Sequence, residues 1–236
     1  MKYVILLLLL ISFLLGCAEK ESPAEKEVKL KMYDFRYKSF QAAEEILIEK
    51  YRSAPIIREV TFNRYKIAVE VLANGKKVEY GGKIYTAEFG RYNSSVEKGE
   101  RFTKIGDANV MILKIEFKRD GEGNIPPPEI NVKSNLFFIL FGVPIPGLKE
   151  ATLTKIEPRI AFEDGFVEPW NYALEKDKIC GFDTNSSIES YTSFCLFTYP
   201  SDKMPKEIVI SAFPSEKITK AAFSGLGYPV ARIPLG

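Results

Sequence analysis

The sequence predicts a mostly β (α+β) domain built on a curved antiparallel sheet, either a half-barrel or a β-sandwich. Many short segments alternate apolar and polar residues, which is the pattern of a strand with one buried face. Turn signals such as Asn74-Gly75 and Gly81-Gly82 separate these segments. A helical spacing of apolar residues is sustained over one long segment, residues 39–53, and a short second helix is expected near residues 215–225.

The first expected elements are a strand and the long helix. Val28, Leu30 and Met32 alternate with lysines, which predicts a strand. Ser39 is placed to cap the following helix, and Pro55 should end it because proline cannot continue a helix. The apolar residues at helical spacing are Phe40, Ala43, Leu47 and Tyr51.

A three-stranded meander is expected next. Residues 65–72 alternate, and the Asn74-Gly75 turn should place Val71 opposite Val78. Gly81-Gly82 should then place Val78 opposite Tyr85. The two turns therefore predict one apolar row that crosses three strands.

The remaining strands are expected at residues 111–119, 151–162, 206–213 and 228–235. Residues 120–128 carry glycines and prolines and predict a turn with a stiff loop. This loop is the best candidate for a boundary inside an otherwise single domain, residues 30–236.

Composition excludes several classes of function. The 236-residue chain has a formal charge of +2, so no basic surplus points to nucleic acid. It has no histidine, which removes the commonest general base and metal ligand, and we expect neither metal nor cofactor. No nucleophile elbow, phosphate loop or dinucleotide fingerprint occurs, so we expect no catalytic residues. A hydrolase would have to use Asp/Glu pairs such as Glu163 and Asp164, or else Tyr or Lys side chains.

The N-terminus has the features of an export signal. A basic start precedes an apolar run of 13 residues, from Tyr3 to Leu15, whereas a membrane-spanning helix needs about 20. The run ends in Leu14-Leu15-Gly16-Cys17, which resembles the lipobox of prokaryotic lipoproteins. This resemblance implies a signal peptide over residues 1–16 and a diacylglyceryl group on Cys17. The alternative is an uncleaved N-terminal helix with an incidental cysteine.

The resemblance places the chain on a membrane, facing outside the cytoplasm. Two acyl chains on one residue satisfy the requirement for stable anchoring, which a single chain does not. Residues 17–29 should form a solvated tether, because they are charged and contain Pro23.

The lipobox also accounts for an odd number of cysteines. If Cys17 carries lipid, Cys180 and Cys195 remain, and outside the cytoplasm they should form a disulfide. Residues 177–183 and 190–199 should form a hairpin in which Cys180 lies opposite Cys195. A redox or metal-binding pair is the alternative reading.

Three further features are candidates for binding or modification. Trp170 in Glu168–Tyr172 is either a core anchor or a ligand-stacking surface, and Asn93 and Asn185 begin glycosylation sequons. The most apolar stretch of the mature chain is either a fully buried strand or the wall of an apolar cavity, or a loop that touches lipid or a partner. The residues of this predicted wall are Leu136, Phe137, Phe138, Ile139, Leu140, Phe141 and Val143.

The order of elements supports a broader resemblance. The meander at residues 65–89, followed by the cysteine-bearing strands of residues 180–214, resembles exported half-barrel lipoproteins of the lipoprotein-carrier kind. This resemblance implies a curved sheet that holds an apolar ligand. We therefore expect a membrane-anchored, non-catalytic protein that binds or carries an apolar ligand. The alternative is a structural or adhesive surface protein, or an accessory subunit with a membrane-protein partner.

Overall fold

The structure is a computed structural model, and it describes residues 26–42, 45–95, 101–121, 125–130, 151–175, 179–214 and 225–235. Its helical elements are η1 (Asp34–Arg36), η2 (Phe40–Ala42) and α2 (Glu45–Ser53). The strands are β1 (Lys26–Tyr33), β2 (Tyr37–Ser39), β3 (Val60–Phe62), β4 (Tyr65–Gly75), β5 (Lys77–Tyr80), β6 (Lys83–Tyr92), β7 (Phe102–Arg119), β8 (Glu129–Ile130), β9 (Ala151–Ala161), β10 (Gly165–Val167), β11 (Phe182–Asp183), β12 (Ser190–Pro200), β13 (Glu207–Pro214) and β14 (Tyr228–Pro234).

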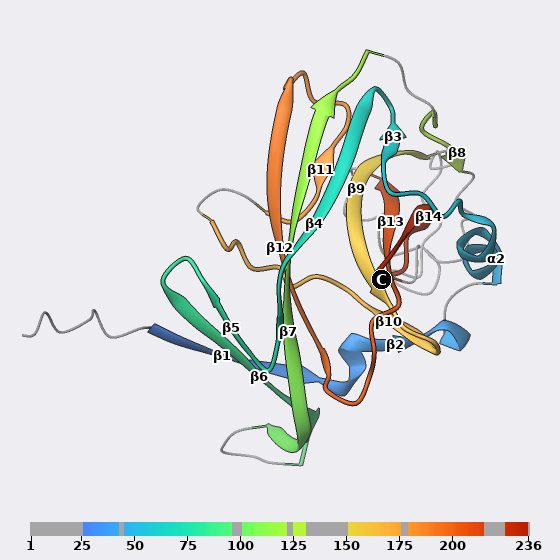
Figure 1. The fold of residues 1–236 in the computed structure, drawn as a ribbon. Coiled ribbons are helices and arrows are strands. Elements are labelled where there is room, and N and C mark those ends of the chain that lie inside the picture. Colours follow the sequence, from blue (N-terminus) through green and yellow to red (C-terminus); the bar gives the residue numbers. More distant parts are fainter. Residues whose placement is uncertain are drawn as a thin grey trace, which may run out of the picture.

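These strands form two sheets that pack face to face as a β-sandwich (Figure 1). The first sheet has the order β1-β6-β7-β4-β3, with β12 also paired to β7 and β5 to β6. The second has the order β14-β13-β9-β10-β2, with β8 and β11 also paired to β9. The predicted mostly β fold is confirmed, and the sandwich describes it better than the half-barrel.

The long strand β7 organises the first sheet. Its C-terminal part pairs with β4 and β12, and its first residues pair with the end of β6, where Phe102 lies opposite Tyr92. We call β1, β5 and β6 the arm, since they diverge from β4 and β12 in Figure 1. Within the arm β1 runs parallel to β6, whereas the other pairings of the described strands are antiparallel.

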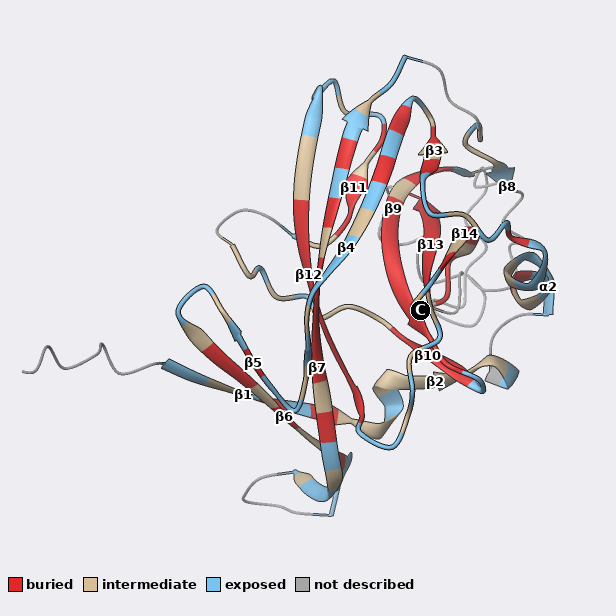
Figure 2. Ribbon diagram, in the orientation of Figure 1, coloured by how far each residue is buried: buried red, intermediate tan, exposed pale blue. Residues whose placement is uncertain are grey.

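The core lies between the two sheets and continues along the first sheet to the point where the arm diverges (Figure 2). The predicted alternation of β7 is confirmed, because Leu113, Ile115 and Phe117 are buried. The first strand also follows its prediction, since Leu30 and Met32 are buried while Lys29 and Lys31 are exposed. It begins at Lys26, however, so residues 26–29 of the predicted tether belong to a strand.

One of the two predicted hairpin turns is confirmed. Gly81 and Gly82 both have positive φ, at 59° and 68°, and Val78 lies opposite Tyr85 as expected. This conformation fits a two-residue hairpin turn and costs glycine no steric strain.

The Asn74-Gly75 prediction is wrong. Strand β4 continues through Gly75 along β7, with Gly75 opposite Val110, and β5 pairs only with β6. Val71 therefore lies opposite Leu113 rather than Val78, and it is 40 % exposed. The third member of the apolar row is instead Val28 of β1, which lies opposite Tyr85.

The predicted helix over residues 39–53 is confirmed only in its second half. Residues 37–39 are strand β2, in which Ser39 lies opposite Gly165, and the amide of Phe40 donates to the carbonyl of Asp164 at 3.2 Å. Ser39 does cap a turn, since its hydroxyl accepts from the amide of Gln41 at 3.2 Å, but that turn belongs to η2. The α-helix itself spans Glu45–Ser53 and packs Leu47 over β14.

The later strands β9, β13 and β14 confirm their predicted segments. The predicted short helix near residues 215–225 lies almost wholly outside the described residues, and so do the signal peptide and the Leu136–Val143 stretch. Residues 125–128 of the predicted stiff loop form no strand beyond a bridge between Ile125 and Phe62.

Candidate functional site

An apolar groove lies beside the C-terminal end of α2, and we call it the α2–β14 groove. Its volume is about 390 Å³, and it is partly open to solvent. The helix, the start of β14 and the segment that follows Ile125 form its walls. The lining residues are Lys50, Ser53, Ala54, Pro55, Phe62, Ile125, Pro126, Pro128, Tyr228, Pro229 and Val230.

The walls of the groove are fixed by backbone contacts. The amide of Asn63 donates to the carbonyl of Ile125 at 3.0 Å, and the amide of Leu153 donates to the carbonyl of Pro128 at 3.2 Å. On the opposite side, residues 54–57 run along the edge of β14 and bond to both backbone groups of Arg232. Prolines supply much of the lining, and a proline offers no backbone N–H to solvent. The groove is therefore a preformed surface with few hydrogen-bond donors.

Lys50 supplies the cation of the groove. Its ammonium lies 5.9 Å from the ring centroid of Tyr228, and its side chain is exposed to solvent. Ser53, another polar lining residue, donates its hydroxyl to the carbonyl of Glu49 at 2.9 Å, so that hydrogen is used inside the helix. The groove thus combines apolar walls with one positive charge at its rim.

A smaller pocket of about 190 Å³ lies on the other side of α2. Phe40, Tyr51 and Phe162 line it, together with Glu163 and Lys206, which form an ion pair at 3.7 Å. The hydroxyl of Tyr51 donates to Glu207 at 2.5 Å, and burial followed by this bond raises the pKa of Tyr51.

The two carboxylates named above for a hydrolase, Glu163 and Asp164, have different partners. Glu163 pairs with Lys206, whereas Asp164 accepts hydrogen bonds from Lys203 at 2.6 Å and from the hydroxyl of Tyr37. The bond from Lys203, followed by that from Tyr37, lowers the pKa of Asp164. Both carboxylates are thus engaged at the surface. No group of three or more Cys, Asp or Glu side chains among the described residues is arranged to hold a metal ion.

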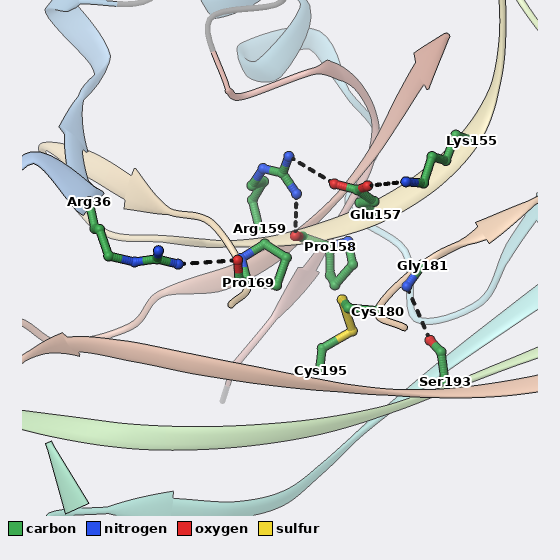
Figure 3. Close-up of a disulfide and its surroundings, with 10 residues drawn as sticks. All are labelled: Arg36, Lys155, Glu157, Pro158, Arg159, Pro169, Cys180, Gly181, Ser193 and Cys195. Atoms are coloured by element: carbon green, nitrogen blue, oxygen red, sulfur yellow. Dashed lines mark hydrogen bonds and ion pairs between the residues drawn. A yellow bond between two sulfur atoms is a disulfide. The ribbon is translucent and has the colours of Figure 1, made fainter. Parts of the chain in front are cut away.

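The predicted disulfide is confirmed, but the predicted hairpin is wrong. The sulfur atoms of Cys180 and Cys195 are bonded, and the Cα atoms lie 4.8 Å apart. Figure 3 shows the bond between β9 and β12, in the space between the two sheets. Strand β11 pairs with β9, with Phe182 opposite Ile156, and β12 pairs with β7. Phe182 therefore does not lie opposite Ser193, as the hairpin required.

A buried charge network on β9 was missed by sequence reasoning. Arg159 is 1 % exposed and Glu157 is 5 % exposed, and their side chains form an ion pair at 3.2 Å (Figure 3). Lys155 binds the other oxygen of Glu157 at 3.0 Å. Arg159 also donates to the carbonyls of Gly225 and Pro158 and stacks on the ring of Phe213 at 4.5 Å. The sequence did contain a signal for this network, because Lys155, Glu157 and Arg159 alternate along one strand and so project from the same face.

Trp170 is held as a structural anchor. Its indole N–H donates to the hydroxyl of Thr198 at 2.8 Å, and the guanidinium of Arg36 stacks 4.1 Å above its ring. Burial lowers the pKa of Arg36. The ring is thus covered on one face, which supports the core reading over a free stacking surface.

The sequons differ in exposure. Asn185 is exposed, whereas Asn93 is half-buried and its side-chain oxygen accepts from the amide of Ser95 at 3.0 Å. Cys17 and the predicted cavity wall at residues 136–143 lie outside the described residues. In the described ranges, no helix is both long and apolar enough to cross a bilayer.

Comparison with known proteins adds no relative. No family model, no curated protein and no solved structure matches this chain.

Proposed function

We propose that this chain is an exported lipoprotein, anchored through a diacylglyceryl group on Cys17, that binds an apolar ligand without covalent chemistry. The α2–β14 groove carries the proposal. Its volume of about 390 Å³ falls in the range of about 300–1,000 Å³ typical of small-molecule sites. Such sites are mostly apolar and contain a small number of polar groups that orient the ligand.

The charge at the rim defines the class of ligand. The ammonium of Lys50 stands beside an otherwise apolar, proline-rich surface. An acyl chain with an acidic head group matches this arrangement, because the chain covers the walls while the carboxylate meets the lysine. An exposed charge such as that of Lys50 contributes about 0.2–1 kcal/mol to an ion pair, and reversing the charge adds repulsion to the loss of that attraction.

The groove also lies next to the predicted cavity wall along the chain. Pro128 lines the groove, and the apolar stretch begins at Leu136, eight residues later (128 to 136). An acyl chain longer than the groove would need such an extension. Residues 136–143 therefore remain our candidates for the rest of the ligand wall.

The test is a fluorescence titration of the mature chain with dansyl-undecanoic acid and with the corresponding alcohol. We expect saturable binding of both probes. Lys50→Glu should weaken binding of the acid about tenfold, equivalent to about 1.4 kcal/mol, and should leave the affinity for the alcohol within about twofold of the parent value. Lys76→Glu is the matched control, since Lys76 is exposed on the first sheet near Asp107 and does not line the groove.

Two results would contradict the proposal. One is the absence of saturable binding of either probe, and the other is an equal effect of the two lysine substitutions. If crosslinking in intact cells then captured a protein at Lys50, the alternative of an accessory subunit would replace ligand carriage.

A further inference from the structure

Four aromatic side chains gather on the outer face of the arm, where it joins β7. We call Tyr33, Phe35, Tyr92 and Phe102 the aromatic patch. Phe35 is 62 % exposed and Tyr92 is 48 % exposed. The ring of Tyr33 is the centre, since it stacks on Phe35 at 5.3 Å, meets Phe102 edge-on at 5.3 Å and lies 6.1 Å from Tyr92.

The patch is built by strand register. Tyr33 of β1 lies opposite Gly90 of β6, and Tyr92 of β6 lies opposite Phe102 of β7. The ring of Phe102 lies against the Cα of Gly90. A Cβ on residue 90 would lie 2.6 Å from Cζ of Phe102 and 2.4 Å from the carbonyl oxygen of Thr103. Glycine at this position therefore allows the rings to assemble on one face.

Cations accompany the rings. The ammonium of Lys31 lies 5.6 Å from the centroid of Phe102, and the guanidinium of Arg101 lies 5.8 Å from that of Tyr92. Arg101 also donates to the hydroxyl of Tyr92. Arg91 pairs with Asp34 at 3.6 Å beside the patch. The rings and their two cations thus form a surface that is both aromatic and positively charged.

We propose that the aromatic patch docks on the anionic surface of the bilayer that carries the anchor. Tyrosine rings favour the membrane–water interface, phenylalanine rings add apolar area that can enter it, and each Lys or Arg near an anionic surface adds attraction. The inference rests on the proposed anchor for its setting. It goes beyond the anchor because it assigns the face of the protein that meets the lipid.

The length of the chain permits this contact. Cys17 precedes Lys26 by nine residues, which span at most about 30 Å when extended. Along β1, Tyr33 is seven residues from Lys26, or about 23 Å. The tether therefore reaches far enough for the outer face of the arm to lie flat on the bilayer.

The test uses the chain from residue 17 with Cys17→Ser, which lacks lipid and keeps every described element, all of which begin at or after Lys26. Co-sedimentation is measured with phosphatidylglycerol vesicles and with phosphatidylcholine vesicles. We expect binding to the anionic vesicles that weakens with added salt. The double substitution Phe35→Ser with Tyr92→Ser should weaken it about tenfold or more. The control pair Ile179→Ser with Ile188→Ser removes two similarly exposed apolar side chains elsewhere and should leave it within about twofold.

A second readout locates the contact. The emission of Phe35→Trp should shift to shorter wavelength with anionic vesicles, whereas the parent chain, with Trp170 alone, supplies the baseline. Absence of binding to anionic vesicles would overturn the inference, as would equal losses for the patch pair and the control pair. Capture of a soluble glycan or protein by the patch in place of vesicles would overturn it too. Because neither ligand nor lipid anchor is present, failure here is separate from failure of the groove or of Cys17 modification.

Discussion

Cys180 and Cys195 join the two sheets of the sandwich covalently. Cys180 stands two residues before β11, which belongs to the second sheet, while Cys195 lies in the middle of β12 in the first. The bond closes a segment of 15 residues that crosses from one sheet to the other. It therefore fixes the sheets against each other, whereas a bond within a hairpin would only reinforce local pairing.

Removal of this disulfide should destabilise the protein by about 3 kcal/mol, which is the chain-entropy expectation for a loop of about 15 residues. Cys180→Ser with Cys195→Ala is the variant, and urea unfolding of the oxidised parent and the variant is the measurement. A reducing agent should lower the free energy of unfolding of the parent and leave the variant unchanged. A loss below about 1 kcal/mol would show that the sheets hold together without the bond.

The buried pair Glu157 and Arg159 should behave as a unit. Arg159→Met alone should cost about 3–5 kcal/mol, because it leaves the carboxylate of Glu157 buried without its nearest buried partner. Adding Glu157→Leu should recover much of that loss, since Lys155 is partly exposed and can turn to water. A double-mutant cycle of unfolding free energies measures the coupling. Additive costs would contradict a joint role.

Alkaline pH should weaken the fold through tyrosines. Burial, followed by the hydrogen bond to Glu207, raises the pKa of Tyr51, and burial with the bond to Glu175 raises that of Tyr80 to about 12. Unfolded tyrosine ionises near pH 10, at about its ordinary pKa. Their stabilisation is thus complete below about pH 10 and declines above it, for Tyr80 through about pH 12, because the folded state there holds more protons than the unfolded state.

Tyr51→Phe tests this titration. Near neutral pH it should cost about 1 kcal/mol through the lost hydrogen bond. Above about pH 10 the difference in free energy of unfolding between the variant and the parent should shrink. The free energy of unfolding of the variant should therefore fall less steeply with pH than that of the parent. Urea titrations at successive pH values give the two slopes, and parallel slopes would show that Tyr51 does not contribute.

Substitution of Gly82 and of Gly75 should distinguish the hairpin turn that the structure has, Gly81-Gly82, from the one that it lacks, Asn74-Gly75. Gly82 has a φ of 68° and open space around its Cα, so Gly82→Ala should cost about 1–2 kcal/mol from the left-handed backbone alone. Gly75 is not among the positive-φ glycines, and a Cβ there would meet its nearest neighbour, the carbonyl of Lys77, at an ordinary 3.8 Å. Gly75→Ala should therefore be neutral or stabilise by up to about 1 kcal/mol. Equal losses of unfolding free energy for the two variants would indicate that Asn74-Gly75 forms a hairpin turn after all.

Local features of the fold were predictable from sequence. The alternation of Leu113, Ile115 and Phe117 gave a strand with a buried face, and the Gly81-Gly82 pair gave both a turn and its register. These signals depend on neighbouring residues, so a single sequence contains them. The pairing of Cys180 with Cys195 was predicted from the expected compartment and the number of cysteines, which require no knowledge of the sheets.

Partners distant in the chain were not predictable. The pairing of β4 with β7 overrides a strong turn signal, because one long strand offers β4 a full-length partner. The parallel contact of β1 with β6 joins segments more than fifty residues apart, as Val28 opposite Tyr85 shows. The α2–β14 groove likewise gathers Lys50, Pro126 and Val230, which no local pattern relates.

The mass of the native N-terminus tests the central claim most directly. Protein purified from membranes should begin at Cys17 and carry the added mass of a diacylglyceryl group, and Cys17→Ser should release the chain from the membrane fraction. A native chain that begins at Met1, or that carries an unmodified thiol at residue 17, would contradict it.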